Sequence, residues 1–161
     1  MNSRILILSD THWAETSHIP TFLTEEMSKS DAVIHCGDFV SVNILDTFAG
    51  YSSLFAVCGN CDETAVRRAL PQERFFNLGG INIGLIHGDR KNFSYIYELK
   101  TKFKEANLII FGHSHVPVLE RIENTIFFNP GSLTYPRGNS SPSFGVMEIN
   151  DGHFEIDHVF L

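Results

Sequence analysis

The stretch Arg4-Ile-Leu-Ile-Leu-Ser-Asp-Thr-His12 decides the fold, because a short apolar run ends directly in residues that can bind a metal ion. Further apolar runs follow at residues 32–36, 54–58, 81–86 and 108–111, and several of them are apolar without alternation. Continuous apolar runs of this length are typical of strands that are covered on both faces. The sequence therefore predicts a sheet whose strands are separated by covering elements.

The segments between these runs have the spacing of amphipathic helices. Helices are expected at residues 17–30, with Pro20 in the first turn, at 41–50, at 62–70 and at 94–105. Asp62 is expected to cap the third of them. After Gly112 the helical spacing ends, and strands are expected at 118–122, 125–128, 144–149 and 153–160. Alternating strands and helices followed by a run of strands predict an α/β protein with a mixed sheet or two packed sheets, in one domain spanning residues 1–161.

The composition narrows the class of protein. The chain has 161 residues, of which 43% are hydrophobic, enough for one domain with a core. No apolar run approaches the roughly 18 residues that a membrane-spanning helix needs. The net charge of -7 argues against general binding to nucleic acid or anionic lipid. Three cysteines and no recognisable signal peptide argue against a disulfide framework, so a cytoplasmic protein is expected.

Five of the apolar runs end at residues that can bind a metal, and glycine stands beside four of these endings. In α/β sheets, ligands collect beyond the carboxyl ends of the strands, where glycine permits sharp turns and close approach. In an extended chain, residues i and i+2 point to the same side, so each i,i+2 pair is expected to present two donors together. The candidate metal ligands are Asp10, His12, Asp38, Asn60, His87, His113 and His115.

This donor set indicates the metal and the chemistry. Two carboxylates, one amide and four imidazoles suit transition-metal ions, and they argue against a site for magnesium or calcium alone. Seven protein ligands exceed what one ion needs, but they fit two ions that share Asp38. Two divalent ions and two aspartates leave a surplus of about two positive charges. Such a pair can activate water and hold a phosphoryl group, although the protein as a whole is acidic.

Simpler interpretations apply to single residues. A lone His or Asp at a strand end is usually a turn residue, but five ordered endings make coincidence improbable. Cys58 and Cys61 form a C-x-x-C sequence that resembles a redox motif, yet a buried Cys58 with a loop Cys61 is the preferred interpretation. Arg90 and Lys91 are expected in a solvated loop. Arg137 is a candidate substrate contact, with a surface turn as the equal alternative.

The ordered motifs resemble those of the calcineurin-like metallophosphoesterases, in particular their small YfcE-type phosphodiesterase branch. They are S-D-T-H at 9–12, G-D at 37–38, G-N-C-D at 59–62, H-G at 87–88 and G-H-S-H at 112–115, with N-P-G-S at 129–132 and P-R-G at 136–138. The resemblance covers nearly the whole chain. It implies a four-layer sandwich of two packed mixed sheets flanked by helices, with the metals at one edge.

The resemblance also implies the role of each ligand. One ion would be held by Asp10, His12 and His115, the other by Asn60, His87 and His113, and Asp38 would bridge them. A metal-bridging hydroxide would attack phosphorus, with Asp38, Asn60 and His113 as the residues closest to catalysis. Manganese is the expected ion, and iron, zinc, nickel and cobalt are alternatives.

One departure from the family pattern concerns the third residue of the G-N-C-D motif, Cys61. Many relatives have histidine where this chain has Cys61, and that histidine contacts the substrate phosphate. A thiol cannot replace an imidazolium as a phosphate clamp. Cys61 is therefore only a weak candidate for substrate binding, and we expect modest activity that favours good leaving groups.

Three functions remain open at this point. The resemblance favours hydrolysis of a small phosphodiester, while the residues alone support only metal-assisted phosphoryl transfer and so allow a phosphomonoesterase. The third is a non-catalytic scaffold, because a retromer subunit resembles these enzymes and serves in protein interaction. The complete set of seven donors argues against the scaffold. Neither the natural substrate nor the oligomeric state follows from the sequence, and a homo-oligomer is compatible with it.

Overall fold

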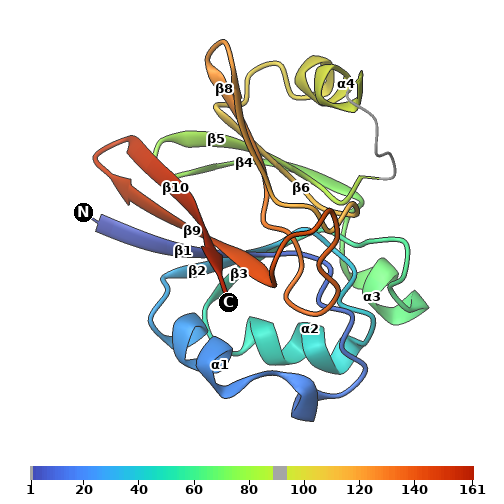
Figure 1. Cartoon of the computed structure of the whole chain (residues 1–161). Coiled ribbons are helices and arrows are strands. Elements are labelled where there is room, and N and C mark those ends of the chain that lie inside the picture. The colour runs from blue at the N-terminus through green and yellow to red at the C-terminus, as the bar shows by residue number, and fades with distance from the viewer. Residues whose placement is uncertain (1, 89–93) are drawn as a thin grey trace.

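The structure, a computed structural model, describes residues 2–88 and 94–161 and contains two five-stranded sheets with helices on both outer faces (Figure 1). The predicted fold class is confirmed. The strands are β1 (Asn2–Leu8), β2 (Ala32–His35), β3 (Ser53–Ala56), β4 (Glu73–Leu78), β5 (Ile81–Ile86), β6 (Leu108–Phe111), β7 (Val118–Ile122), β8 (Thr125–Asn129), β9 (Ser143–Asn150) and β10 (His153–Phe160). The helices are a 3-10 helix η1 (Thr16–His18) and α1 (Thr21–Ser28), α2 (Val42–Ala49), α3 (Thr64–Ala69) and α4 (Ser94–Lys102).

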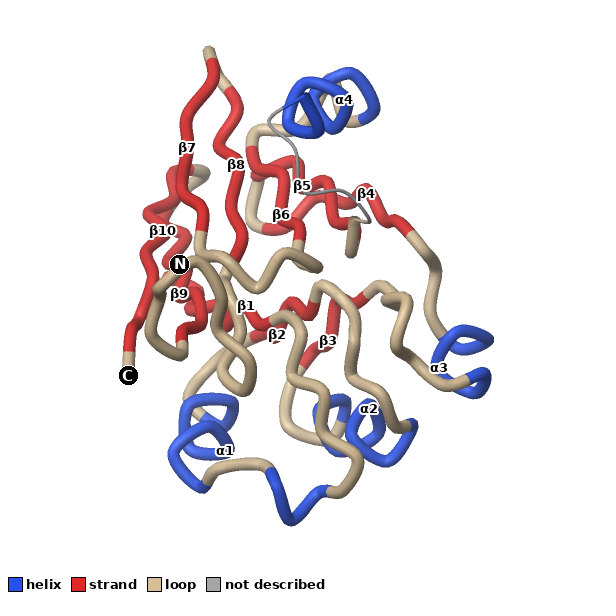
Figure 2. Tube along the Cα trace, turned by 45° about the vertical axis from the view of Figure 1, so that its right-hand side comes forward, coloured by secondary structure: helices blue, strands red, loops and turns tan. Residues whose placement is uncertain are grey.

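Each sheet contains three adjacent parallel strands, with antiparallel pairing on one side of them in the first sheet and on both sides in the second. The first sheet has the order β10-β9-β1-β2-β3, in which β1, β2 and β3 run parallel. The second has the order β4-β5-β6-β8-β7, in which β5, β6 and β8 run parallel. Parallel strands end on the same side of a sheet, so the loops after them share an edge. In Figure 2 the loops after β1, β2 and β3 (tan) gather at one end of the first sheet, facing the second.

The alternation of side chains along the strands produces the four layers. In β1, Ile5 and Ile7 join the core between the two sheets, whereas Leu6 and Leu8 pack toward α1 and α2. Strand β6 repeats this pattern, with every second residue facing α4 on the outer side of the second sheet. Successive strand residues point to opposite faces, so a strand covered on both faces must be apolar throughout.

Three local predictions differ from the structure. The helix expected at 17–30 is divided, because Pro20 takes an extended conformation between η1 and α1. Strand β4 was not expected, since its side chains alternate between half-buried and exposed at the edge of the sheet. Asp62 does not cap α3: Glu63 occupies the cap position, and Asp62 accepts hydrogen bonds elsewhere. No helix in the described part of the chain is both long and apolar enough to span a membrane.

Candidate metal centre

The structure brings all seven predicted donors together at the carboxyl ends of strands from both sheets. The first sheet provides both carboxylates, one imidazole and the amide, and the second sheet provides three imidazoles. Every donor side chain has another within 4 Å. The site thus lies where the two sheets meet, and neither sheet could form it alone. The seven residues are Asp10, His12, Asp38, Asn60, His87, His113 and His115.

Asp38 lies between imidazoles from the two sheets. Its Oδ2 is 3.5 Å from Nε2 of His12 and 3.4 Å from Nε2 of His87. Its Oδ1 accepts a hydrogen bond of 2.7 Å from the backbone N–H of Cys61. One oxygen is therefore used to fix the carboxylate, and the other faces the remaining donors.

The Oδ1 atom of Asp10 is buried and has no hydrogen-bond partner among the described residues. It lies 3.2 Å from Nε2 of His115, 3.8 Å from that of His12 and 3.9 Å from that of His87. A buried carboxylate oxygen without a donor is costly, unless a cation stabilises it. Oxygen and imidazole nitrogen around one point form a set that transition-metal ions bind, so the residues present fit such an ion.

Backbone carbonyls fix the orientation of two imidazoles. The Nδ1 of His87 lies 2.7 Å from the carbonyl oxygen of Cys36, and the Nδ1 of His115 lies 2.7 Å from that of Tyr135. A carbonyl oxygen only accepts, so in both rings Nδ1 carries the hydrogen and Nε2 is left with a lone pair. Outer hydrogen bonds of this kind are typical of metal-binding histidines.

Asn60 connects the remaining imidazoles. Its Oδ1 is 3.1 Å from Nε2 of His87 and 3.1 Å from Nδ1 of His113. His87 in turn faces Asp38, so the amide and two imidazoles form a second group beside the first. Among the described residues there are three groups in which all donor atoms of the group lie within 4.8 Å of one another. The groups share members: Asp10, His12 and His115; Asp10, Asp38 and His87; and His12, Asp38 and Cys61.

The backbone is left-handed at five of the seven donors. Asp10 and His12 have φ of 53° and 50°, and His113 and His115 have φ of 67° and 59°. The prediction that each pair is presented by an extended chain is therefore wrong, although the paired donors do lie together. Residues other than glycine rarely adopt a positive φ, and the resulting backbone strain persists only where the surrounding structure enforces it.

Two glycines allow the loops to approach this closely. A Cβ atom on Gly59 would lie 2.1 Å from Oδ1 of Asp38, and one on Gly112 would lie 2.0 Å from Oγ of Ser9. Because Ser9 donates to the Asp10 carboxylate, either added methyl group would displace a proposed ligand or its support. The glycines beside the strand ends are thus required by the packing of neighbouring loops.

The electrostatics favour ionised carboxylates. Burial by itself raises the pKa of Asp10 and Asp38, but the neighbouring imidazoles outweigh it, and both pKa values lie below the ordinary value. Burial lowers the pKa of His12, which Asp38 only partly opposes. For His87, contact with Asp38 and the charge of Asp10 outweigh burial, and the pKa is raised. The centre therefore presents two negative charges to a cation at neutral pH.

Several positioning residues were not predicted. Asp62 accepts hydrogen bonds from the N–H groups of Asp38, Val40 and Gly59, at 3.1, 2.7 and 2.7 Å, and so joins the loops after β2 and β3. Ser132 donates to the carbonyl oxygen of Asp10 at 2.8 Å. Both residues belong to sequence motifs, Asp62 to G-N-C-D and Ser132 to N-P-G-S, and that was the signal for a role in the site. Their partners are far away along the chain, so the sequence did not indicate these contacts.

His35 also supports the centre. Its Nδ1 accepts from the N–H of Gly37 at 3.1 Å, so its Nε2 carries the hydrogen that faces Oγ1 of Thr11 at 3.2 Å. The ring is fully buried and stacks on Phe39. Burial lowers the pKa of His35 to about 3, which keeps it neutral. His35 is therefore a neutral support beneath the first donor turn.

The other candidates lie at the border of the site. The side chain of Cys61 is exposed, with its sulfur within reach of His12 and Asp38. All three cysteines are free, which agrees with the absence of a disulfide framework. Arg137 is exposed and contacts the site through its backbone N–H, which donates to the carbonyl oxygen of His115 at 3.1 Å. Arg90 and Lys91 lie outside the described residues.

Comparison with known proteins gives consistent results. A family model described as the calcineurin-like phosphoesterase superfamily domain matches residues 3–152. The chain is 33% identical over 135 residues to a probable metallophosphoesterase of Methanocaldococcus jannaschii, which covers 81% of this chain and 68% of that protein. It is 25% identical over 162 residues to a phosphodiesterase of the same organism, covering 90% and 92%.

A solved structure extends the similarity of the fold. The chain is similar to vacuolar protein sorting 29 of Cryptosporidium parvum, with a TM-score of 0.80 and 17% identity, over 99% of this chain and 98% of that chain. At this identity the likeness concerns the fold alone.

Proposed function

The chain belongs to the calcineurin-like phosphoesterase superfamily, and from this premise we propose that it is a phosphodiesterase that depends on two divalent metal ions. The observation that carries the proposal is the Oδ1 atom of Asp10, a buried acceptor without a donor among the described residues, which faces three imidazoles. Membership of the superfamily supports hydrolysis of a phosphate ester and the use of divalent ions.

The donors divide into two groups with one shared member. We assign Asp10, His12 and His115 to one ion, because the Asp10 carboxylate lies between these two imidazoles. Asn60, His87 and His113 are assigned to the other, since the amide oxygen contacts both rings. The contacts of Asp38 with His12 and His87, one from each group, support Asp38 as the residue that would be shared by the two ions.

In the reaction, water adds to phosphorus, the ester P–O bond breaks, and an alcohol and a phosphate monoester leave. The bound ions would supply Lewis acidity, which lowers the pKa of water and stabilises charge on the phosphoryl oxygens. The protein keeps both carboxylates ionised and directs the Nε2 lone pairs of His87 and His115 into the centre. His113 and Asn60 are the more exposed donors, so substrate would approach from their side.

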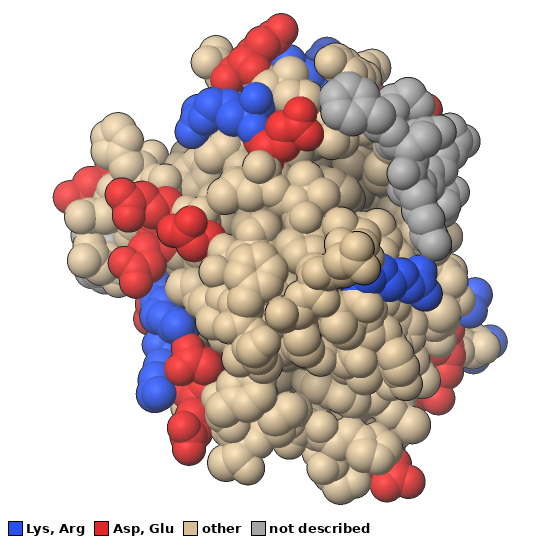
Figure 3. Space-filling model, viewed as in Figure 1, with Lys and Arg blue, Asp and Glu red and all other residues tan. Residues whose placement is uncertain are grey.

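A small substrate fits the surface better than a large polyanion. Figure 3 shows one face on which basic side chains are scattered among acidic ones around an uncharged centre. With a net charge of -7, positive charge at the metal centre would come from the metal ions. Preference for a diester is supported by the phosphodiesterase among the relatives. Manganese as the ion, a cytoplasmic location and the oligomeric state stay predictions.

Metal analysis tests the proposal. Purified protein, stripped with a chelator and reloaded with manganese, should retain about two ions per chain and hydrolyse bis(p-nitrophenyl) phosphate faster than p-nitrophenyl phosphate. Faster hydrolysis of the monoester would support a phosphomonoesterase instead. Fewer than one ion per chain after loading would support a non-catalytic scaffold, for which the likeness to vacuolar protein sorting 29 supplies only the fold.

A further inference from the structure

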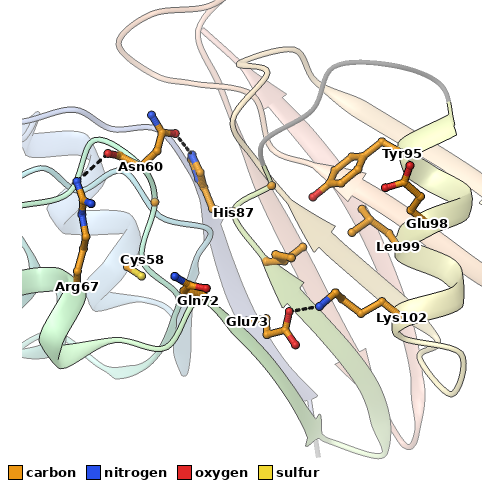
Figure 4. Close-up of a pocket in the computed structure, with 13 residues that line it drawn as sticks. Cys58, Asn60, Arg67, Gln72, Glu73, His87, Tyr95, Glu98, Leu99 and Lys102 are labelled. Carbon is orange, nitrogen blue, oxygen red and sulfur yellow. Dashed lines mark hydrogen bonds and ion pairs between the residues drawn. The ribbon is translucent and has the colours of Figure 1, made fainter.

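A cleft of about 490 Å³ begins directly beside the candidate metal centre (Figure 4). It is formed by the loop after β3, by α3, by the start of β4, by the end of β5 and by α4. Asn60 and His87, which contact each other, are both donors of the centre and lining residues of the cleft. Its volume lies in the range of about 300–1,000 Å³ that is usual for small-molecule sites. A group attached to a phosphate at the centre could therefore extend into it.

One wall of the cleft is apolar and rigid. Tyr95 and Leu99 project from α4 toward the cleft in Figure 4, and both are largely buried. Ile86, at the end of β5, continues this wall. The Tyr95 ring packs edge-on against Phe111, with ring centroids 6.3 Å apart. A fixed aromatic and aliphatic wall is suited to a flat apolar group.

Gly88 permits the position of the aromatic ring. It has φ of 87°, and a Cβ atom on it would lie 2.7 Å from the hydroxyl oxygen of Tyr95. Any other residue here would push the ring away from the metal centre or strain the backbone. The entrance of the cleft is therefore shaped by the same H-G motif that provides His87.

The charged groups around the cleft balance one another. Arg67 is held by two carbonyl oxygens, those of Asp62 at 2.6 Å and Asn60 at 3.0 Å. Glu73 and Lys102 form an ion pair that joins β4 to α4 and lies at the end of the cleft away from Asn60 (Figure 4). With Glu98, the described residues of the lining carry two positive and two negative side chains. These side chains therefore offer no surplus positive charge for a second phosphate group.

We propose that this cleft binds a nucleoside. The nucleoside is one of the two ester groups of the diester, the one that stays bound to phosphorus when hydrolysis releases the other ester group as an alcohol. The inference rests on the proposed function and specifies its substrate class. A nucleoside is uncharged, has a flat base for the wall of Tyr95 and Leu99, and has polar edges for groups such as Gln72. A lipid chain would meet the ion pair at the far end, and a polyphosphate would meet Glu73 and Glu98.

Two diesters with the same leaving group test the proposal. They are p-nitrophenyl thymidine 5′-phosphate and methyl p-nitrophenyl phosphate, and the quantity measured is the ratio of their kcat/KM values. The manganese-loaded protein should prefer the nucleoside diester by about tenfold or more, the discrimination expected from burying a group of this size. Gln72→Trp, at an exposed position of the lining, should fill the cleft and reduce the ratio toward one.

A matched pair of variants on one helix separates the cleft from general damage. Tyr95→Ala removes the aromatic wall and should also reduce the ratio, whereas Tyr97→Ala, at an exposed residue outside the lining, should leave the ratio unchanged. If Tyr95→Ala fails to fold, Gln72→Trp still decides the question, because its site is exposed.

Binding of thymidine itself distinguishes the two proposals. Chemical-shift changes in the protein on addition of thymidine require no hydrolysis, and Gln72→Trp should abolish them. If thymidine binds in this way but no diester is hydrolysed, the nucleoside site stands and the proposed function fails. If both diesters are hydrolysed with equal efficiency and thymidine causes no shifts, the proposed function stands and the nucleoside site is refuted.

Discussion

The turn at 10–12 after β1 and the turn at 113–115 after β6 have the same backbone form but different surroundings. In both, the first and third residues have left-handed φ and provide proposed ligands. In the first turn, the N–H groups of Asp10 and His12 donate to carbonyl oxygens of the loop after β2, both at 3.0 Å. In the second turn, the N–H of His113 donates to the Asp10 side chain at 2.9 Å. The second turn thus depends on the first.

The burial of the residues also differs between the first and the second turn. Asp10 and Thr11 are 0% exposed, whereas His113 and Ser114 are only half-buried; the third residues differ the other way, since His12 is half-buried and His115 is buried. The first turn is part of the core as well as part of the metal centre, and the second mainly presents donors. Substitution of Asp10 in the first turn should therefore reduce both stability and activity, while substitution of His113 in the second should reduce mainly activity.

The largest effect is expected for Asp10→Ala. It removes a proposed ligand, and it leaves the hydroxyl of Ser9 and the N–H of His113 without their acceptor. Hydrolysis should fall by roughly 10³-fold, which corresponds to the several kcal/mol that a metal ion supplies. The free energy of unfolding of the metal-free protein should fall by about 1–3 kcal/mol, measured by urea denaturation. An unchanged denaturation midpoint would show that the first turn has no structural role.

His113→Ala should separate the two properties. Loss of this ligand should reduce hydrolysis by roughly 10²-fold or more, and about one ion per chain should be lost on metal analysis. Because the side chain is half-buried, the metal-free protein should keep its free energy of unfolding within about 0.5 kcal/mol. A variant that hydrolyses diesters at the original rate would defeat the assignment of His113 as a ligand.

The pH dependence of stability should reveal the support beneath the first turn. His35 has a pKa near 3 in the folded protein and near 6.5 when unfolded, so below pH 6.5 only the unfolded state takes up the proton. Stability of the metal-free protein should therefore decrease as the pH falls from 6.5, with a contribution of about 1.4 kcal/mol per pH unit from this residue. His35→Gln should flatten the dependence between pH 6 and 4. Ser114→Ala, in the second turn, should keep the original slope.

Two serines form a matched pair for the comparison. Ser132 donates to the carbonyl oxygen of Asp10 and accepts from the N–H groups of Thr134 and Tyr135, and it is fully buried. Ser114 is half-buried and accepts from Asn129 at 3.1 Å. Ser132→Ala should lower the free energy of unfolding by about 1–3 kcal/mol, and Ser114→Ala by about 0.5–1.5 kcal/mol. Equal losses of unfolding free energy in the two variants, measured by thermal or urea unfolding, would contradict the view that the first turn contributes more to stability than the second.

The fold could be predicted from the sequence where one strong signal dominated. Strands β1, β2 and β6 are covered on both faces, and a continuous apolar run reveals that directly. Strand β4 was missed because it is an edge strand whose side chains alternate, with Glu73 and Phe75 exposed. The helix boundary at Asp62 was wrong because the side chain serves three backbone groups of other loops, a tertiary preference that local capping rules do not contain.

The proximity of the donors could also be predicted, but their conformation could not. Parallel strands of one sheet end at the same edge, which gathers the donors of each sheet. That the two sheets bring these edges together was implied only by the resemblance to the family, which has its metals at one edge of two packed sheets. Left-handed φ at Asp10 or His113 has no local signal, because contacts between different strands impose it. The support from Ser132 joins residues 122 positions apart. Such contacts follow from the packing of the sheets and become visible only once that packing is known.

The smallest effect is expected for Cys61→His, in the loop after β3 beside the first turn. Position 61 lies within reach of His12 and Asp38, and the side chain is exposed, so an imidazole could extend toward the phosphate without disturbing the core. An imidazole can hold a phosphate oxygen or donate a proton to the leaving group, which a thiol does poorly. Hydrolysis of an alkyl diester should rise by about tenfold, less than the full effect of an evolved acid, because the new ring would stand at an exposed position.

The p-nitrophenyl diester provides the control for this variant. Its leaving group needs little protonation, so its rate of hydrolysis should change far less than that of the alkyl diester. Cys61→Ser, which keeps the size of the side chain without adding a base, should change neither rate. Equal rates of the two proteins on the alkyl ester would mean that position 61 does not reach the substrate. The contact of this part of the site with the phosphate would then involve the proposed ligands of the first turn, Asp10 and His12, without position 61.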